Sequence, residues 1–185
     1  MIRKLFRNAK IFTPQDPGRP LCGSQQSGPL ASWERGALLV CNGRIEAVGG
    51  EAEVLAALGS GELQQEVDCG GMCMIPGLVD PHTHMCFVGE REEEFGERLR
   101  GVPYLDILAR GGGILSTVRA VRNATQEELF HETLHRAQRA LRLGTTTLEM
   151  KSGYGLDTAT ELKMLKVIKD VSLASSLDVV PTFLG

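Results

Sequence analysis

The sequence lacks long hydrophobic runs and has no large excess of either charge. Its longest apolar runs are a handful of residues, such as 37–41, whereas a transmembrane helix needs about 20. The 20 Lys and Arg residues against 23 Asp and Glu give a net charge of −3, which favours neither a nucleic-acid nor a membrane partner. The N-terminus lacks the apolar core and cleavage site of a signal peptide. We therefore expect a cytoplasmic protein.

The sequence also lacks cysteine pairs at the spacing of a redox or zinc motif. Its five cysteines are an odd number, and three residues separate Cys69 from Cys73. We expect reduced thiols that pack as small hydrophobic side chains. The apolar share of 42% and the charged share of 23% are those of a folded globular chain rather than a disordered one.

Residues 1–75 predict a small, mostly antiparallel β unit. A Pro- and Gly-rich stretch at 13–35 predicts a long surface loop. Asn42-Gly43 is typical of a type I′ hairpin turn, because both of its central residues need positive φ. A short helix is expected to stop at Gly59. The expected elements are strands at 2–12, 37–41, 44–48, 65–69 and 72–75, and a helix at 51–58.

From residue 76 the pattern becomes an alternation of strands and helices. This α/β order predicts a parallel sheet with right-handed crossovers, as at the start of a (β/α)₈ TIM-type barrel. Such a barrel needs about 250 residues, so the chain is expected to stop after about three barrel strands. The expected elements are strands at 78–84, 145–150 and 179–184, and helices at 104–110, from the Thr125 capping box to 143, and from the Asp157 cap onward with Leu162, Leu165 and Ile168 inward.

His82 and His84 give the strongest chemical signal. They follow an apolar strand, and residues i and i+2 of a strand project to the same side. The two imidazoles can therefore converge on one metal ion at the end of a strand, where barrel enzymes place their active sites. Two unrelated histidines remain the alternative.

A competing metal motif occurs at residues 131–135. His131, Glu132 and His135 match H-E-x-x-H, in which a helix presents two histidines to zinc. The extended form of this motif needs Gly at 138 and His at 141, where the chain has Gln and Leu. We therefore expect a solvated helix face, with a zinc protease as the remote alternative.

Three segments after the expected strands carry candidate substrate contacts. Arg91 can clamp a carboxylate, although a solvated charge run is the alternative. Tyr154 and Lys151 directly follow the strand at 145–150, whose carboxyl end faces the site. Glu149 is a further pocket candidate on that strand. The glycines at 111–113 lack the spacing of a phosphate-binding motif and predict an active-site loop.

These residues resemble the imidazolonepropionase family of the amidohydrolase superfamily. The resemblance is loose over residues 1–75 and close from 75 to 185. It is carried by these motifs: IPGLVDPHTH (75–84), Gly89-x-Arg91-x-Glu93-Glu94-Phe95, Tyr104-Leu105-Asp106-Ile107, GGGILSTVRA (111–120), EMKSGYGLD (149–157), ELKMLKV (161–167) and VVPTFLG (179–185).

The resemblance implies hydrolysis of 4-imidazolone-5-propanoate to N-formimidoyl-L-glutamate in histidine degradation. It implies one zinc or iron ion with His82 and His84 as ligands, Arg91 on the substrate carboxylate, Tyr154 as a substrate contact and Tyr104 as a pocket residue. It also implies a homodimer and a barrel that carries a small β-sandwich. Residues 1–75 would be part of that sandwich, and residues 76–185 the first units of an incomplete barrel.

The family's chain is about twice this length, and its other metal ligands and proton-transfer residue lie in later strands. We therefore expect that residues 1–185 alone are inactive and do not fold stably. The alternatives are an amidohydrolase that acts on another cyclic amide or amidine, and a non-catalytic fragment, either inert or docked on a longer chain.

Overall fold

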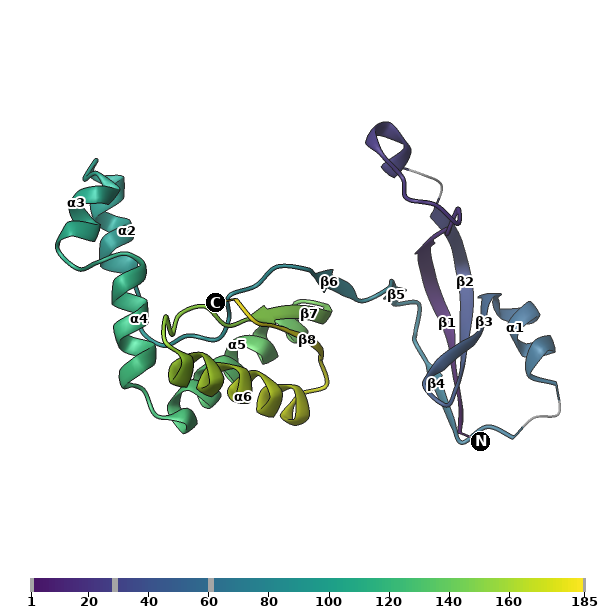
Figure 1. The fold of residues 1–185 in the computed structure, drawn as a ribbon. Coiled ribbons are helices and arrows are strands. Elements are labelled where there is room, and N and C mark those ends of the chain that lie inside the picture. The colour runs from purple at the N-terminus through teal and green to yellow at the C-terminus, as the bar shows by residue number, and fades with distance from the viewer. Residues whose placement is uncertain (1, 28–29, 60–61, 185) are drawn as a thin grey trace. The chain divides into compact units, whose positions relative to one another are not determined.

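The computed structural model describes residues 2–27, 30–59 and 62–184. The chain divides into two compact units, Met1–Pro76 and Gly77–Gly185, and each is treated by itself below (Figure 1). Within the described residues, no helix combines the length and the apolar character that crossing a membrane requires.

The first unit is a mixed β-sheet with one α-helix. Its elements, in chain order, are β1 (Arg3–Pro14), a 3-10 helix (Gly23–Ser27), β2 (Leu30–Cys41), β3 (Arg44–Gly50), α1 (Glu51–Leu58), β4 (Gln65–Asp68) and β5 (Cys73–Met74). The central strand β1 pairs antiparallel with β2 and parallel with both β4 and β5. β3 extends the antiparallel part beyond β2. The sheet is thus less antiparallel than the sequence indicated.

The two turn expectations in this unit are confirmed. Asn42 and Gly43 both have positive φ, 49° and 79°, as a type I′ turn between β2 and β3 requires. Gly59 follows α1 with a φ of 57°, a conformation that glycine adopts without strain.

The expected loop at 13–35 is wrong at both of its ends, because β1 continues to Pro14 and β2 already begins at Leu30. Trp33 pairs with Ile11, and Leu30 with Pro14 at the far end of β1. The side chains of residues 30–34 alternate between exposed and half-buried, so this stretch has the period of a strand with one covered face. The Pro- and Gly-rich composition concealed that alternation.

The second unit has the α/β order. Its elements are β6 (Leu78–Asp80), α2 (Glu92–Leu99), α3 (Tyr104–Ala109), α4 (Ile114–Asn123), α5 (Gln126–Arg142), β7 (Thr145–Lys151), α6 (Thr158–Ala174) and β8 (Asp178–Thr182). The sheet order is β6-β7-β8, and both pairings are parallel. α5 leads into β7 and α6 into β8, and the two helices pack against each other and against the sheet (Figure 1).

The capping boxes and caps of the long helices match the sequence expectation. The Glu128 amide donates to the Thr125 hydroxyl over 3.1 Å, and the Glu128 carboxylate accepts the Thr125 amide over 2.8 Å. Asp157 accepts the Thr160 amide over 2.8 Å at the start of α6. These side chains satisfy amide groups that have no partner inside the helix.

The core of the second unit lies between the sheet and the helices α5 and α6. Ile168 is fully buried there as expected, but Leu162 is 60% exposed, so its inward placement was wrong. A neighbouring row of side chains on α6 faces the core instead. The fully buried members of this core include Leu129 and Ala137 of α5, Leu148 and Met150 of β7, and Met164, Val167, Ile168 and Val171 of α6.

Residues 89–113 hold more helix than the sequence indicated. Besides α3, the helix α2 forms although Gly96 lies within it, and Glu92, Glu93 and Glu94 occupy its first turn, where acidic side chains complement the helix dipole. α4 begins after Gly113, whose φ is 66°. Gly101, Gly111 and Gly113 lie next to helix ends, whereas Gly96 lies inside α2.

Candidate metal and substrate site

The two histidines of the H-x-H motif lie together just beyond the end of β6. Their ring centroids are 5.3 Å apart, and the ring planes are inclined at 64°. His82 is exposed and His84 is half-buried. The expected strand at 78–84 ends at Asp80, so both histidines lie in an irregular segment just beyond the carboxyl end of β6, where their imidazoles still reach the same side of the chain.

Hydrogen bonds to β7 hold the segment between the two histidines. Thr83 donates its hydroxyl to the Glu149 carbonyl over 2.6 Å and its amide to the Glu149 carboxylate over 3.2 Å. The Lys151 amide donates to the Thr83 carbonyl over 3.3 Å. Because Thr83 is fixed on both sides, the directions of His82 and His84 are fixed as well.

Glu149 and Lys151 form an ion pair next to His82. The Lys151 ammonium contacts the Glu149 carboxylate and lies 3.3 Å from His82 Nδ1. The bond from Lys151, with further bonds from Thr182 and the Thr83 amide, lowers the pKa of Glu149 to about 2. Both residues thus border the histidine pair, and Glu149 remains a carboxylate at neutral pH.

His84 is the better prepared of the two imidazoles for a ligand. Its Nδ1 is buried and has no hydrogen-bond partner among the described residues. Burial, and then the nearby Lys151 and His82, lower the pKa of His84, which favours the neutral imidazole that binds metals. An unpaired, buried imidazole nitrogen beside a second imidazole fits part of a metal site. No cluster of three or more His, Cys, Asp or Glu side chains that could hold a metal forms within the described residues.

Arg91 and Tyr154 line one pocket of about 520 Å³, although they are 63 positions apart in the printed sequence. The Tyr154 ring lies 5.7 Å from the His84 ring and 6.2 Å from the Phe87 ring. Arg91 Nε donates to the Glu94 carboxylate over 2.9 Å. The structure therefore brings the expected carboxylate clamp and the expected tyrosine to one cavity, next to the histidine pair.

Tyr104 lies apart from that pocket's lining. It begins α3, is 40% exposed, and has the Arg98 guanidinium 6.0 Å above its ring. A Cβ on Gly113 would come within 2.8 Å of the Tyr104 hydroxyl, so Tyr104 packs against the glycine loop. Glu94 links this loop to Arg91, because its carboxylate also accepts the Gly113 amide over 3.0 Å.

The competing H-E-x-x-H motif lies on the outside of α5. His131, Glu132 and His135 are all exposed, and the nearest charged partner of His131 is Glu127, one turn earlier and 3.8 Å away. This is the solvated helix face that the sequence favoured.

Three residues at this site escaped the sequence analysis. Phe87 and Arg136 line the pocket with Tyr154, and Arg136 stacks on the Phe87 ring at 3.8 Å. Glu161 is buried beneath the loop that carries Tyr154. Arg136 belongs to none of the motifs named above, and Glu161 begins the motif ELKMLKV (161–167), to which no site role was assigned. The available signal for Glu161 was its position one turn after a Gly-rich loop that follows a strand.

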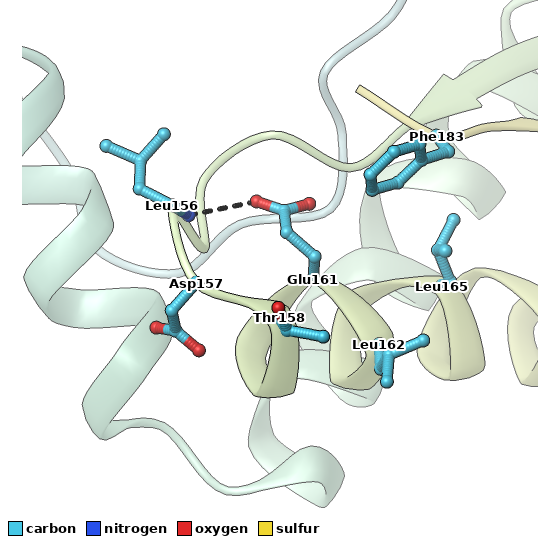
Figure 2. A pocket seen from close by; sticks show the side chains of 7 residues that line it. All are labelled: Leu156, Asp157, Thr158, Glu161, Leu162, Leu165 and Phe183. Atoms are coloured by element: carbon cyan, nitrogen blue, oxygen red, sulfur yellow. Dashed lines mark hydrogen bonds between the residues drawn. The ribbon is translucent and has the colours of Figure 1, made fainter. Parts of the chain in front are cut away.

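A second cavity, of about 610 Å³, lies on the outer side of the same loop. Figure 2 shows Leu162, Leu165 and Phe183 along it, with Glu161 reaching back to the Leu156 amide. The exposed Leu162 belongs to this cavity rather than to the core.

No protein-family profile matches the chain. Individual proteins do match it. The chain is 60% identical over all its 185 residues to an imidazolonepropionase of Syntrophobacter fumaroxidans, and 58% identical to one of Desulfotalea psychrophila. The chain is a relative of the imidazolonepropionases. It corresponds to their N-terminal portion and spans about 43% of the first relative's length and 44% of the second's.

Several solved enzyme structures share the fold. The guanine deaminase of E. coli matches 98% of the chain and 36% of its own with a TM-score of 0.65 at 16% identity. The zinc- and atraton-bound E241Q mutant of atrazine chlorohydrolase from Arthrobacter aurescens matches 97% of the chain and 35% of its own with a TM-score of 0.55 at 17% identity. At such identities the likeness shows the fold alone, a mixed α/β arrangement.

Proposed function

We propose that the chain is the N-terminal portion of an enzyme that hydrolyses 4-imidazolone-5-propanoate to N-formimidoyl-L-glutamate. The observation that carries this proposal is that Arg91 and Tyr154 line one pocket and that the Tyr154 ring lies 5.7 Å from the ring of His84, in a chain that is 60% identical to an imidazolonepropionase. The substrate has a ring amide to be opened and a carboxylate to be held. Arg91 in the pocket would hold the carboxylate, and the histidine pair next to the pocket would serve the ring amide.

We propose His82 and His84 as two ligands of one zinc or iron ion. When bound, such an ion would supply a Lewis acid that lowers the pKa of a water molecule and polarises the ring carbonyl. A catalytic zinc ion usually has three protein ligands, so we place the remaining ligands and the proton-transfer residue outside residues 1–185. The zinc in the atrazine chlorohydrolase structure supports this kind of chemistry in the fold.

The chain's own residues would bind and orient the substrate. We assign the propanoate to the Arg91 guanidinium, which can form paired hydrogen bonds with a carboxylate. Tyr154 would form the wall between that carboxylate and the histidines. Thr83, held by Glu149, would keep the two imidazoles in place. Lys151 borders the histidine pair and Tyr104 lies outside the pocket lining, and we give neither of them a step.

We also propose the finer architecture. The second unit would be the start of a (β/α)₈ barrel, and the first unit would be part of a small β-sandwich. The parallel order β6-β7-β8, with α5 leading into β7 and α6 into β8, supports the barrel. The isolated chain would then lack most of the barrel, and we expect it to show no turnover.

The test is a hybrid enzyme in which residues 1–185 replace the matching segment of the S. fumaroxidans relative. The expected result is zinc- or iron-dependent conversion of imidazolonepropanoate. Mass spectrometry of the product measures this conversion. His82→Ala and His84→Ala should each weaken metal binding and remove activity. His131→Ala is the control and should change neither. A hybrid that binds zinc and has native circular dichroism, but does not convert this substrate, would refute the proposal.

The role of Arg91 separates this function from that of another cyclic-amide hydrolase. Hydrogen bonds to charged groups contribute about 1.5–3 kcal/mol, so Arg91→Ala should raise KM roughly 10- to 150-fold. Arg110→Ala removes an exposed arginine of the same unit as a control and should leave KM unchanged. An unchanged KM in Arg91→Ala would assign the site to a substrate without a carboxylate.

A further inference from the structure

We propose that Glu161 is a positioning residue for Tyr154, because its carboxylate holds the backbone of the loop that carries this tyrosine. Glu161 lies in the first turn of α6 and is 5% exposed. Its Oε2 accepts the Gly153 amide over 2.7 Å. Its Oε1 accepts the Gly155 amide over 2.6 Å. The same oxygen accepts the Leu156 amide over 3.1 Å, the bond drawn in Figure 2.

The three donors make a carboxylate necessary at this position. An ionised carboxylate only accepts hydrogen bonds, and here both of its oxygens are used. A glutamine of the same shape has one oxygen and one NH₂ group. In either orientation, Glu161→Gln would turn an amide donor toward at least one backbone N–H. Burial disfavours the charged form of Glu161, yet bonds from Ser152 and from these amides lower its pKa overall.

Residues 153–156 belong to no helix or strand, so regular secondary structure supplies no hydrogen-bond partners for their amides. Gly153 has a φ of 118° and Leu156 a φ of 52°, so the segment is neither helix nor strand. Leu156 pays a conformational penalty for this left-handed geometry, which its bond to Glu161 offsets. A Cβ on Gly155 would lie 2.7 Å from the Glu161 amide and 2.8 Å from Oε1. Glycine at 155 therefore permits the close approach of the carboxylate.

Tyr154 lies between the two bonded glycines. Because the amides on both sides of it are fixed, the direction in which its side chain leaves the backbone is fixed too. This direction brings its ring to 5.7 Å from His84 and into the pocket that Arg91 lines. Glu161 itself does not line that pocket; it borders the cavity on the other side of the loop. Its influence on the pocket must pass through the backbone of Tyr154.

Asp157 offers a matched control. It is the neighbouring carboxylate at the same helix start. It accepts the Thr160 amide and pairs with Arg122 Nε over 3.0 Å, and this Nε also donates to the Gly155 carbonyl, but Asp157 is not the acceptor for the amides of Gly153, Gly155 and Leu156. Asp157→Asn keeps an oxygen for the cap and removes one charge, as Glu161→Gln does. A difference between the two variants thus reports the loop contacts and not the helix N-terminus or the net charge.

The first measurement is hydrogen exchange by mass spectrometry on the hybrid enzyme. In Glu161→Gln, backbone amides at 153–156 should exchange at least about tenfold faster, because each bonded amide loses a charged acceptor. Peptides from α5 should exchange at the parent rate, and Asp157→Asn should leave 153–156 unchanged. Equal exchange at 153–156 in Glu161→Gln and the parent would overturn the proposal.

The second measurement is a double-mutant cycle, which rests on the proposed function because it needs the substrate. Glu161→Gln should lower kcat/KM at least about tenfold in the parent but less than about twofold when Tyr154 is already alanine. The same factor in both backgrounds would show that Glu161 does not act through Tyr154. If the hybrid has no activity, the proposed function fails while the exchange measurement still decides the role of Glu161.

Discussion

Arg136 contacts the loop that follows the histidine pair. Replacing Arg136 tests whether its contacts stabilise the conformation of that loop. Its Nη1 donates to the Phe87 carbonyl over 2.6 Å and to the Met85 carbonyl over 3.3 Å. Its guanidinium carbon lies 3.8 Å from the Phe87 ring centroid. The side chain is 23% exposed, and burial lowers its pKa. One cation on α5 thus holds both the backbone and the ring of the loop.

The expected cost of Arg136→Ala follows from these contacts. Hydrogen bonds from a charged donor contribute about 1.5–3 kcal/mol. A partly desolvated cation–π contact adds roughly 0.5–2 kcal/mol. Allowing for overlap between the two, we expect about 2–4 kcal/mol, which is a roughly 30- to 1,000-fold larger opening equilibrium of the loop. Arg136→Lys keeps the charge and one donor but loses the planar stack, so about half of this cost is expected.

Hydrogen exchange of a peptide that spans residues 85–88 in the hybrid enzyme measures this opening. Glu132→Ala is the control, because it removes only a half-exposed ion pair at 3.4 Å, which is worth about 0–1 kcal/mol. The reasoning is refuted if Arg136→Ala and Glu132→Ala exchange alike at 85–88. It is also refuted if lysine restores the parent rate, because the stacked geometry would then contribute nothing.

Two further predictions concern single ionisable groups. Hydrogen bonds from the Thr160 amide and hydroxyl lower the pKa of Asp157. The contribution of Asp157 to stability is therefore complete above the ordinary carboxyl pKa and is lost as the pH falls through the lowered pKa. Thermal unfolding between pH 5 and pH 2 should depend on pH more steeply in the parent than in Asp157→Asn. Cys86 is fully buried and its pKa is raised to about 12, mainly by burial, so iodoacetamide at neutral pH should modify the exposed Cys22 and Cys73 but not Cys86, as peptide mass spectrometry can show.

Local signals in the sequence predicted the parts of the fold that local chemistry decides. Asn42-Gly43 and the Thr125 box each satisfy their requirement within four residues, so no distant contact was needed to recognise them. The first half of β2 was missed because its partner is the end of β1, some twenty residues earlier. Composition alone favoured a loop there, and only the pairing supplies the strand's hydrogen bonds.

The candidate site shows the same division. The i, i+2 spacing of His82 and His84 is enough to predict that both rings reach one side. Arg91 and Tyr154 come together through the tertiary arrangement of segments that are distant in the sequence. Residue spacing does not predict this arrangement. The resemblance to a family selected these two residues, but it carried no information on the groups that hold them.

Three carboxylates share that holding role, each by accepting backbone amides of a different segment. Glu149 accepts the amide between the two histidines, and Glu94 ties the glycine loop to Arg91. Glu161 accepts the amides on both sides of Tyr154. These segments lie outside regular secondary structure, so strand and helix bonds cannot fix them. Charged acceptors that reach from β7, α2 and α6 therefore set the geometry of the pocket. Because none of these three carboxylates belongs to the apolar core cluster of this unit, isosteric Glu→Gln changes should disturb the pocket more than the stability of the fold.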